Sequence, residues 1–303
     1  MAAILFHEAV AAPGHGGWTH FDGTSRDVET ALTDVLEGLD PVVGEALLAA
    51  ETRPRVTPIG DGAIVILRGV NLNADADPED MVSLRIWIDA ERIVSVQLRQ
   101  LRAVQDTRDR LVRTGGTSGA VLATLVQCLA ERMEATLGAL DDAALSVEER
   151  VIAEDARDLR RQIVELRRRA ILLRRFLAPQ REAISALQNA GLSWIIQSDR
   201  RSLNETGDRL LRYVEDLDAL RDRLQVAKDE LANLQAERLN RNLYLLAIIS
   251  AIFLPLGFLT GLLGVNVGGI PGTESAGAFW LVSGGLALLA VGQVVLLRWL
   301  RWF

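Results

Sequence analysis

The pattern of hydrophobic and polar positions changes character along the 303-residue chain. Over roughly the first 100 residues, short runs alternate apolar and polar side chains, which is typical of strands with one buried face. Two stretches with helical spacing lie among them: Arg26–Gly38, with Ser25 as N-cap, and Pro41–Ala50, with Asp40 as N-cap. We therefore predict an α/β or α+β unit whose second half is mostly antiparallel. The expected strands are Ala3–Val10, Gly17–Phe21, Arg55–Ile59, Ala63–Val70, Ser83–Asp89 and Arg92–Leu98.

From Leu101 onward the apolar positions recur at helical spacing, and we expect no further strand. Glycines after Thr114 break the first helix, and Pro179 is expected to end the third, because proline removes a backbone donor inside a helix. The predicted helices are Leu101–Val112, Ser118–Leu140, Val147–Leu177 and Gln180–Asn189.

Five leucines then recur every seven residues, and a second set follows three residues after each of them. The leucines are Leu203, Leu210, Leu217, Leu224 and Leu231, and the second set is Thr206, Tyr213, Leu220, Ala227 and Leu234. This a/d heptad predicts one long helix that packs along a seam. The seam fits an intramolecular helical hairpin as well as an oligomeric stalk.

The heptad leads into Asn242–Asn266, which carries no charged residue. About 20 apolar residues rising ~1.5 Å each span a bilayer core, so Leu243–Leu263 can cross a membrane as one helix. A second uncharged run covers Ser275–Leu297. We predict a cytoplasmic α/β domain at 1–115, long amphipathic helices at 116–200, a stalk at 201–242, a first crossing at 243–265, an external loop at 266–277, a second crossing at 278–297 and a tail at 298–303.

The charges on either side of these runs predict the topology. Arg238 and Arg241 precede the first crossing, Arg298 and Arg301 follow the second, and the loop between them has no lysine or arginine. By the positive-inside rule both termini are cytoplasmic. The N-terminus lacks the basic region of a signal peptide, which agrees with this topology.

The composition narrows the possible functions. The net charge is −7 and no basic tract occurs, which argues against nucleic acid as a partner. The lone Cys128 excludes a disulfide framework. His7, His15 and His20 are the only histidines and show no metal-ligand spacing, so we interpret them as ordinary strand or surface residues. No enzymatic constellation or cofactor site is visible.

Small and weakly polar residues form one stripe along the first crossing. The stripe comprises Ser250, Leu254, Gly257, Gly261 and Gly264, and extended backward it meets Ala247, Leu243 and Asn240. Such a stripe fits a helix–helix contact, and it also fits the lining of a narrow pore. Two helices cannot enclose an aqueous path, so a pore requires several copies of the chain. The second crossing is uniformly apolar and is expected to face lipid.

The first crossing ends in Gly264-Val265-Asn266, which by itself could be a simple helix stop. However, the run from Pro255 to Asn266, followed by Val-Gly-Gly-Ile-Pro-Gly, resembles the signature of the CorA-type metal transporters, in which a Gly-Met-Asn tripeptide ends the pore helix. Valine in place of methionine looks most like the zinc-transporting ZntB branch. Trp18–Gly23 and Glu51–Arg55 are also similar to that branch, so the resemblance covers nearly the whole chain.

This resemblance implies a funnel-shaped homopentamer in a bacterial inner membrane that transports divalent cations, zinc above all, and couples transport to protons. It places Gly264, Val265 and Asn266 at the outer mouth of the pore, where five Asn266 side chains would contact a hydrated ion without gripping it. The implied pore lining is Asn240, Leu243, Ser250, Leu254, Gly257 and Gly261.

Some features depart from the magnesium branch, and two alternatives stay open. The acidic residue that usually follows the tripeptide is absent, and Gly272 stands near its place. Glu274 is the loop's only carboxylate; it either attracts cations as a ring or is simply solvated. Magnesium, cobalt or nickel could replace zinc as the transported ion. A membrane-tethered coiled-coil sensor or scaffold would need no pore.

Overall fold

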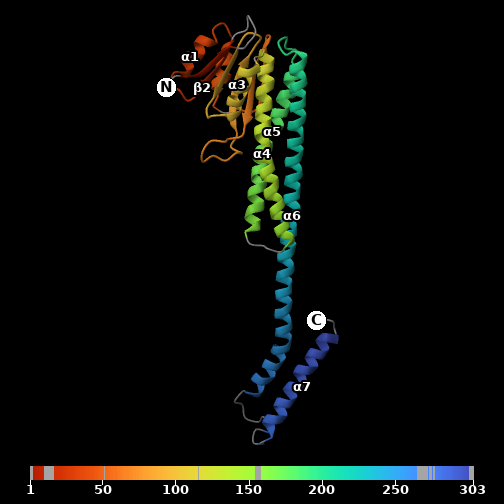
Figure 1. Cartoon of the computed structure of the whole chain (residues 1–303). Coiled ribbons are helices and arrows are strands. Elements are labelled where there is room, and N and C mark those ends of the chain that lie inside the picture. The colour runs from red at the N-terminus through yellow and green to blue at the C-terminus, as the bar shows by residue number, and fades with distance from the viewer. Residues whose placement is uncertain are drawn as a thin grey trace. The chain divides into compact units, whose positions relative to one another are not determined.

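The protein is described by a computed structural model, which covers residues 3–9, 17–50, 52–114, 116–153, 158–264, 272, 275 and 277–299. The chain divides into two compact units, Met1–Glu230 and Leu231–Phe303. The first unit contains a sheet and helices α1 to α5 together with the first part of α6. The second contains the rest of α6 and helix α7 (Figure 1).

The sheet has six strands in the order β1-β2-β6-β5-β4-β3. All neighbouring strands run antiparallel except β2 and β6, which pair in parallel from Trp18 opposite Ile93 to Asp22 opposite Gln97. Each predicted strand is confirmed to within one residue at either end. The observed bounds are β1 Ile4–Ala9, β2 Gly17–Asp22, β3 Arg55–Ile59, β4 Gly62–Gly69, β5 Val82–Ile88 and β6 Ile93–Gln97.

Two short helices, α1 (Val28–Val35) and α2 (Pro41–Leu48), cover one face of the sheet. The Asp40 cap of α2 is confirmed, because its carboxylate accepts the Val42 N–H at 3.0 Å. The Ser25 cap of α1 is wrong: a turn occupies residues 23–27, and α1 begins after Asp27. Asp22 holds this turn by accepting the N–H and the hydroxyl of Thr24.

The opposite face of the sheet is covered by longer helices, namely α3 (Arg102–Thr114), α4 (Ser118–Ile152) and α5 (Leu159–Asn189). At Gly69 on β4, an added Cβ would lie 2.7 Å from Leu129 Cδ2 of α4. Glycine therefore lets α4 approach the sheet closely. Because helices cover both faces, β4 and β5 are buried along almost their whole length.

The predicted boundary between Ser118–Leu140 and Val147–Leu177 is wrong, since α4 continues to Ile152 and α5 begins only at Leu159. Leu140, Ala144, Val147 and Val151 are all buried and continue one helical stripe. The aspartates at positions 141 and 142 lower helix propensity by only about 0.6 kcal/mol each, which is less than the burial of that stripe contributes.

Pro179 does not end a helix as predicted but lies inside α5. Proline in a helix interior costs about 3 kcal/mol. The helical turns of α5 that follow Pro179 make tertiary contacts that offset this cost. Ile184 and Leu187 are buried, and Gln180 accepts the Arg68 N–H of β4 through its side-chain oxygen at 2.6 Å.

Helix α6 (Gln197–Leu263) begins in the first unit and lies beside α4 and α5 there (Figure 1). Leu203, Leu210, Leu217 and Leu224 are buried within this single chain. Arg223 of α6 forms salt bridges of 2.8 Å with Asp141 and 2.9 Å with Glu148 of α4. This part of the heptad therefore packs against helices of the same chain, which is the intramolecular alternative.

The second unit contains two helices that are long and apolar enough to cross a membrane, the C-terminal part of α6 and α7 (Ala278–Trp299). Most of their large apolar side chains, such as Phe253 and Leu281, are exposed in the single chain. That exposure suits a hydrocarbon surrounding or neighbouring copies, since water would disfavour so much apolar surface.

Candidate ion pathway

The stripe of small residues on α6 is uncovered in the single chain. Every member from Asn240 to Gly264 is exposed, and Leu254 has 76 % of its surface accessible. A Cβ built at Gly257 or Gly261 would meet nothing within 4 Å. The stripe is therefore a continuous face that no other described residue of this chain covers.

A different face of α6 is partly buried. It consists of Ile248, Ile252, Pro255, Leu256 and Leu259, and the matching face of α7 consists of Ser283, Leu286, Ala290, Gln293 and Leu297. Both sets recur at helical spacing and belong to the same compact unit. We infer that the two helices face each other along these sets.

At 3.6 residues per turn, the stripe is centred about 160° around α6 from the partly buried face. The small residues thus point away from α7. Both interpretations of the stripe, a helix–helix contact and a pore lining, now require a second copy of the chain, because α7 is not available to cover it.

The helix remains regular up to the tripeptide. Gly264 donates its N–H to Thr260 O at 3.0 Å, and the Thr260 hydroxyl donates to Gly257 O at 3.1 Å. A Cβ at Gly264 would lie 3.1 Å from Thr260 O, so a larger residue would crowd the last turn. Val265, Asn266 and Glu274 lie outside the described residues, and their roles stay predictions.

The chemistry of the stripe is neutral. From Asn242 to Gly264 no residue carries a charge, and the polar groups on the stripe are the Asn240 amide, the Ser250 hydroxyl and the backbone. Within the described ranges, no three His, Cys, Asp or Glu side chains gather so that they could hold a metal. Such a lining can pass an ion that keeps its water, but it offers no strong ligand.

The described histidines lie in the first unit and do not come together. His7 is exposed, and its Nδ1 lies 2.8 Å from Thr19 Oγ1. His20 is 1 % exposed, and its Nδ1 lies 2.7 Å from Ser95 Oγ. Burial lowers the pKa of His20 to about 4, with Gln97 and Asp22 opposing the shift. His15 lies outside the described residues.

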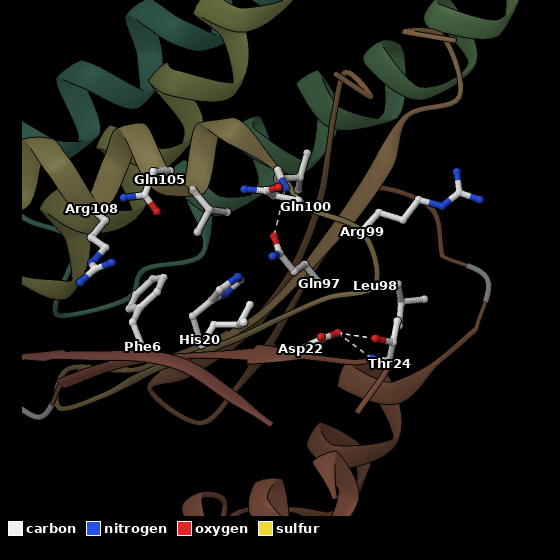
Figure 2. A pocket seen from close by; sticks show the side chains of 13 residues that line it. Phe6, His20, Asp22, Thr24, Gln97, Leu98, Arg99, Gln100, Gln105 and Arg108 are labelled. Carbon is white, nitrogen blue, oxygen red and sulfur yellow. Dashed lines mark hydrogen bonds between the residues drawn. The ribbon is translucent and has the colours of Figure 1, made fainter. Parts of the chain in front are cut away.

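Sequence reasoning did not anticipate that His20 lines a cavity of about 410 Å³ between the sheet and α3. Gln97 at the end of β6 and Arg108 on α3 line it too. Figure 2 shows the His20 and Gln97 side chains extending toward each other and Arg108 beside Phe6. No spacing along the chain joins these residues, because the parallel pairing of β2 with β6 brings the first two together.

Comparison with known proteins identifies the family. Residues 14–299 match the family described as CorA-like Mg²⁺ transporter protein. The chain belongs to this family. The CorA-type resemblance drawn from the Gly-Val-Asn motif is confirmed, and the family is one of ion transporters.

Curated relatives match this CorA-family chain over nearly its whole length. The divalent cation transporter CmaX of Pseudomonas aeruginosa is 40 % identical over 299 residues, which cover 96 % of this chain and 88 % of that protein. The zinc transport protein ZntB of Yersinia enterocolitica is 36 % identical over 297 residues, covering 97 % and 90 %.

Solved structures agree with the fold. The full-length CmaX protein matches with a TM-score of 0.82 at 40 % identity, covering 96 % of this chain and 90 % of that one. The complete CorA magnesium transporter from Methanocaldococcus jannaschii matches with a TM-score of 0.79 at 18 % identity, covering 93 % and 89 %. The predicted fold class, an α+β chain with long helices and two apolar C-terminal helices of the CorA type, is confirmed.

Proposed function

We propose that this chain transports divalent metal cations across a bacterial inner membrane, along an axis surrounded by five copies. The observation that carries the proposal is the orientation of α6: its small-residue stripe is exposed and points away from α7. A ring of copies would bring the stripes together around the axis. Asn266 would then stand at the outer mouth, and both termini would be cytoplasmic.

Zinc is the ion we propose first, because a relative at 36 % identity is named a zinc transport protein and valine replaces methionine in the tripeptide. Magnesium, cobalt or nickel is the second candidate, since the CmaX relative is named only for divalent cations. The neutral lining favours neither, because a hydrated ion presents water to the walls whatever its identity.

Flux measured in liposomes tests the proposal. The purified chain is reconstituted around a metal-sensitive dye, and influx of Zn²⁺ and Mg²⁺ is followed with and without a pH gradient. Asn266→Ala should lower metal influx by about tenfold, because the ring of amide dipoles is lost. Unchanged influx in this variant would reject the proposed role of Asn266, and competition between the two ions identifies the preferred one.

A membrane-tethered scaffold is the alternative of a different class. It needs no flux and no ring of five chains. Mass measurement of the detergent-solubilised protein separates the two: a pentamer supports the pore, whereas a monomer or dimer without metal flux supports the scaffold.

A further inference from the structure

The cavity beside His20 lies on the side of the sheet opposite α1 and α2. It is bounded by β1, β2, β6 and α3 and has a volume of about 410 Å³. This size is within the range of small-molecule sites. His20, Asp22, Gln97 and Arg108 are among its polar lining residues (Figure 2). None of them belongs to the proposed ion pathway.

A chain of hydrogen bonds fixes the tautomer of His20. The Trp18 indole N–H donates to Ser95 Oγ at 2.7 Å, and an indole can only donate. Ser95 is fully buried, and among the described residues its hydroxyl forms hydrogen bonds with Trp18 and His20 alone. The hydroxyl proton must therefore go to His20 Nδ1, 2.7 Å away. A neutral imidazole has one N–H, which then lies on Nε2.

His20 Nε2 is buried, and no hydrogen bond within 3.5 Å reaches it from the residues that the structure describes, although Gln97 lies close enough to raise the pKa of the ring. A buried donor without a partner costs about 1–3 kcal/mol, so its persistence calls for an explanation. Because the residue lines the cavity, an acceptor bound there would satisfy this N–H. Donors linked in series also polarise one another, which strengthens the last one.

Gln97 supplies a second donor at the same place. Its side-chain oxygen accepts the Leu101 N–H at 3.1 Å, and this contact fixes which end of the amide is oxygen. The NH₂ group is then on the other side. In Figure 2 the Gln97 side chain and the His20 ring extend toward the same space. Two N–H groups that converge in this way match the two oxygens of a carboxylate.

Charged side chains of both signs line the cavity. The Arg108 guanidinium lies 5.0 Å from the centre of the Phe6 ring, which stacks on His20 at 5.0 Å. Asp22 adds one negative charge, with one carboxylate oxygen accepting two hydrogen bonds from Thr24. Its repulsion partly offsets the attraction of Arg108 for an anion. Arg99, which also lines the cavity, is paired with Asp80 at 2.8 Å.

We infer that this cavity binds the carboxylate of a small organic acid, through the N–H groups of His20 and Gln97 and the charge of Arg108. A metal ion fits less well. It would need the lone pair of Nε2, which would move the ring proton to Nδ1 and leave the buried Ser95 hydroxyl without an acceptor.

The experiment measures the Tm of the full chain in detergent while acetate replaces chloride at constant ionic strength. Acetate should raise the Tm of the wild type saturably, by about 2–4 °C. His20→Asn can keep the Ser95 contact but loses the Nε2 donor, so the rise should disappear. His20→Gln places an amide nearer Nε2 and should retain part of it. His7→Asn is the matched control on the other face of the sheet and should keep all of it.

An equal rise in the wild type and His20→Asn would overturn the inference, because acetate would then act on the protein in general. A His20-dependent rise with Zn²⁺ and none with acetate would also overturn it. Should His20→Asn fail to fold, Arg108→Gln at the cavity wall provides the test. The acetate concentration that gives half of the maximal Tm rise should increase several-fold in this variant. An unchanged concentration contradicts the inference. Neither result depends on metal flux, so the proposed transport stands or falls separately.

Discussion

Gly119 of α4 lies against the Asp199 carboxylate at the start of α6. A Cβ at position 119 would sit 3.0 Å from Asp199 Cγ and 2.9 Å from the Trp194 carbonyl oxygen. Asp199 is 5 % exposed and accepts the Ile196 N–H at 3.3 Å. Burial raises the pKa of Asp199, with the hydrogen bonds from Ile196 and Ser198 opposing the shift. Only a glycine lets the two helix starts meet in this way.

Gly119→Ala should therefore destabilise the first unit by about 1–3 kcal/mol, because the added methyl group displaces either the carboxylate or the backbone. Gly138→Ala is the matched control, since it lies on the same helix with nothing within 4 Å. It should stabilise the protein by up to about 1 kcal/mol through helix propensity. Thermal unfolding of both variants measures the difference, and equal shifts would show that the contact is relaxed in solution.

His20 makes stability depend on pH. Its pKa is about 4 in the folded chain and 6.5 in the unfolded one, so the unfolded state takes up the proton first as the pH falls. The free energy of unfolding is therefore unaffected by His20 above pH 6.5. It decreases as the pH falls from 6.5 toward 4, by about 3 kcal/mol at most. His20→Gln and His20→Asn should both make the Tm less dependent on pH between pH 4 and pH 6.5. A slope identical to that of the wild type would mean that His20 is not buried as described.

The buried heptad provides a test of the intramolecular packing. Leu217 of α6 is 2 % exposed, whereas Val226, on the same helix, is 70 % exposed. Leu217→Ala should cost about 2–5 kcal/mol, because it leaves a cavity within one chain. Val226→Ala should change stability by less than about 0.5 kcal/mol. If the cost of Leu217→Ala depends on protein concentration, the seam is formed between chains instead.

Two glycines in the membrane-length helices separate a pore-lining face from a lipid-facing one. Neither Gly257 on α6 nor Gly284 on α7 has anything within 4 Å of an added Cβ. Gly257 belongs to the stripe, whereas Gly284 lies away from the partly buried face of α7. Gly257→Leu should reduce metal flux in liposomes by at least about tenfold, while Gly284→Leu should leave it within about twofold. Equal effects would argue against the stripe as the lining.

Much of the fold could be predicted because its signals are local. Alternation located every strand, and Asp40 with Pro41 marked the start of α2. The errors at Pro179 and around Leu140 share one cause, which is that tertiary anchoring outweighed a local helix-breaking tendency. The parallel pairing of β2 with β6 could not be predicted, since it joins residues about 75 positions apart and leaves no periodic trace.

The candidate pathway was visible in the sequence for a similar reason: the stripe repeats every three or four residues on a single helix. The cavity beside His20 was not visible. Its donors come from β2 and β6, and the tautomer of His20 follows from Trp18 and Ser95, which form no motif. His20 is buried beside the cavity and His7 is exposed, and this difference arises only when the sheet is assembled.

The pairing of β2 with β6 also sets an order of events during synthesis. The N-terminal hairpin β1–β2 cannot join the sheet until β6 has emerged, so it must wait for residue 97. The first membrane-length segment begins about 145 residues later, which at 5–20 residues per second leaves about 7–29 s. The sheet can thus close on the ribosome before insertion into the bilayer begins.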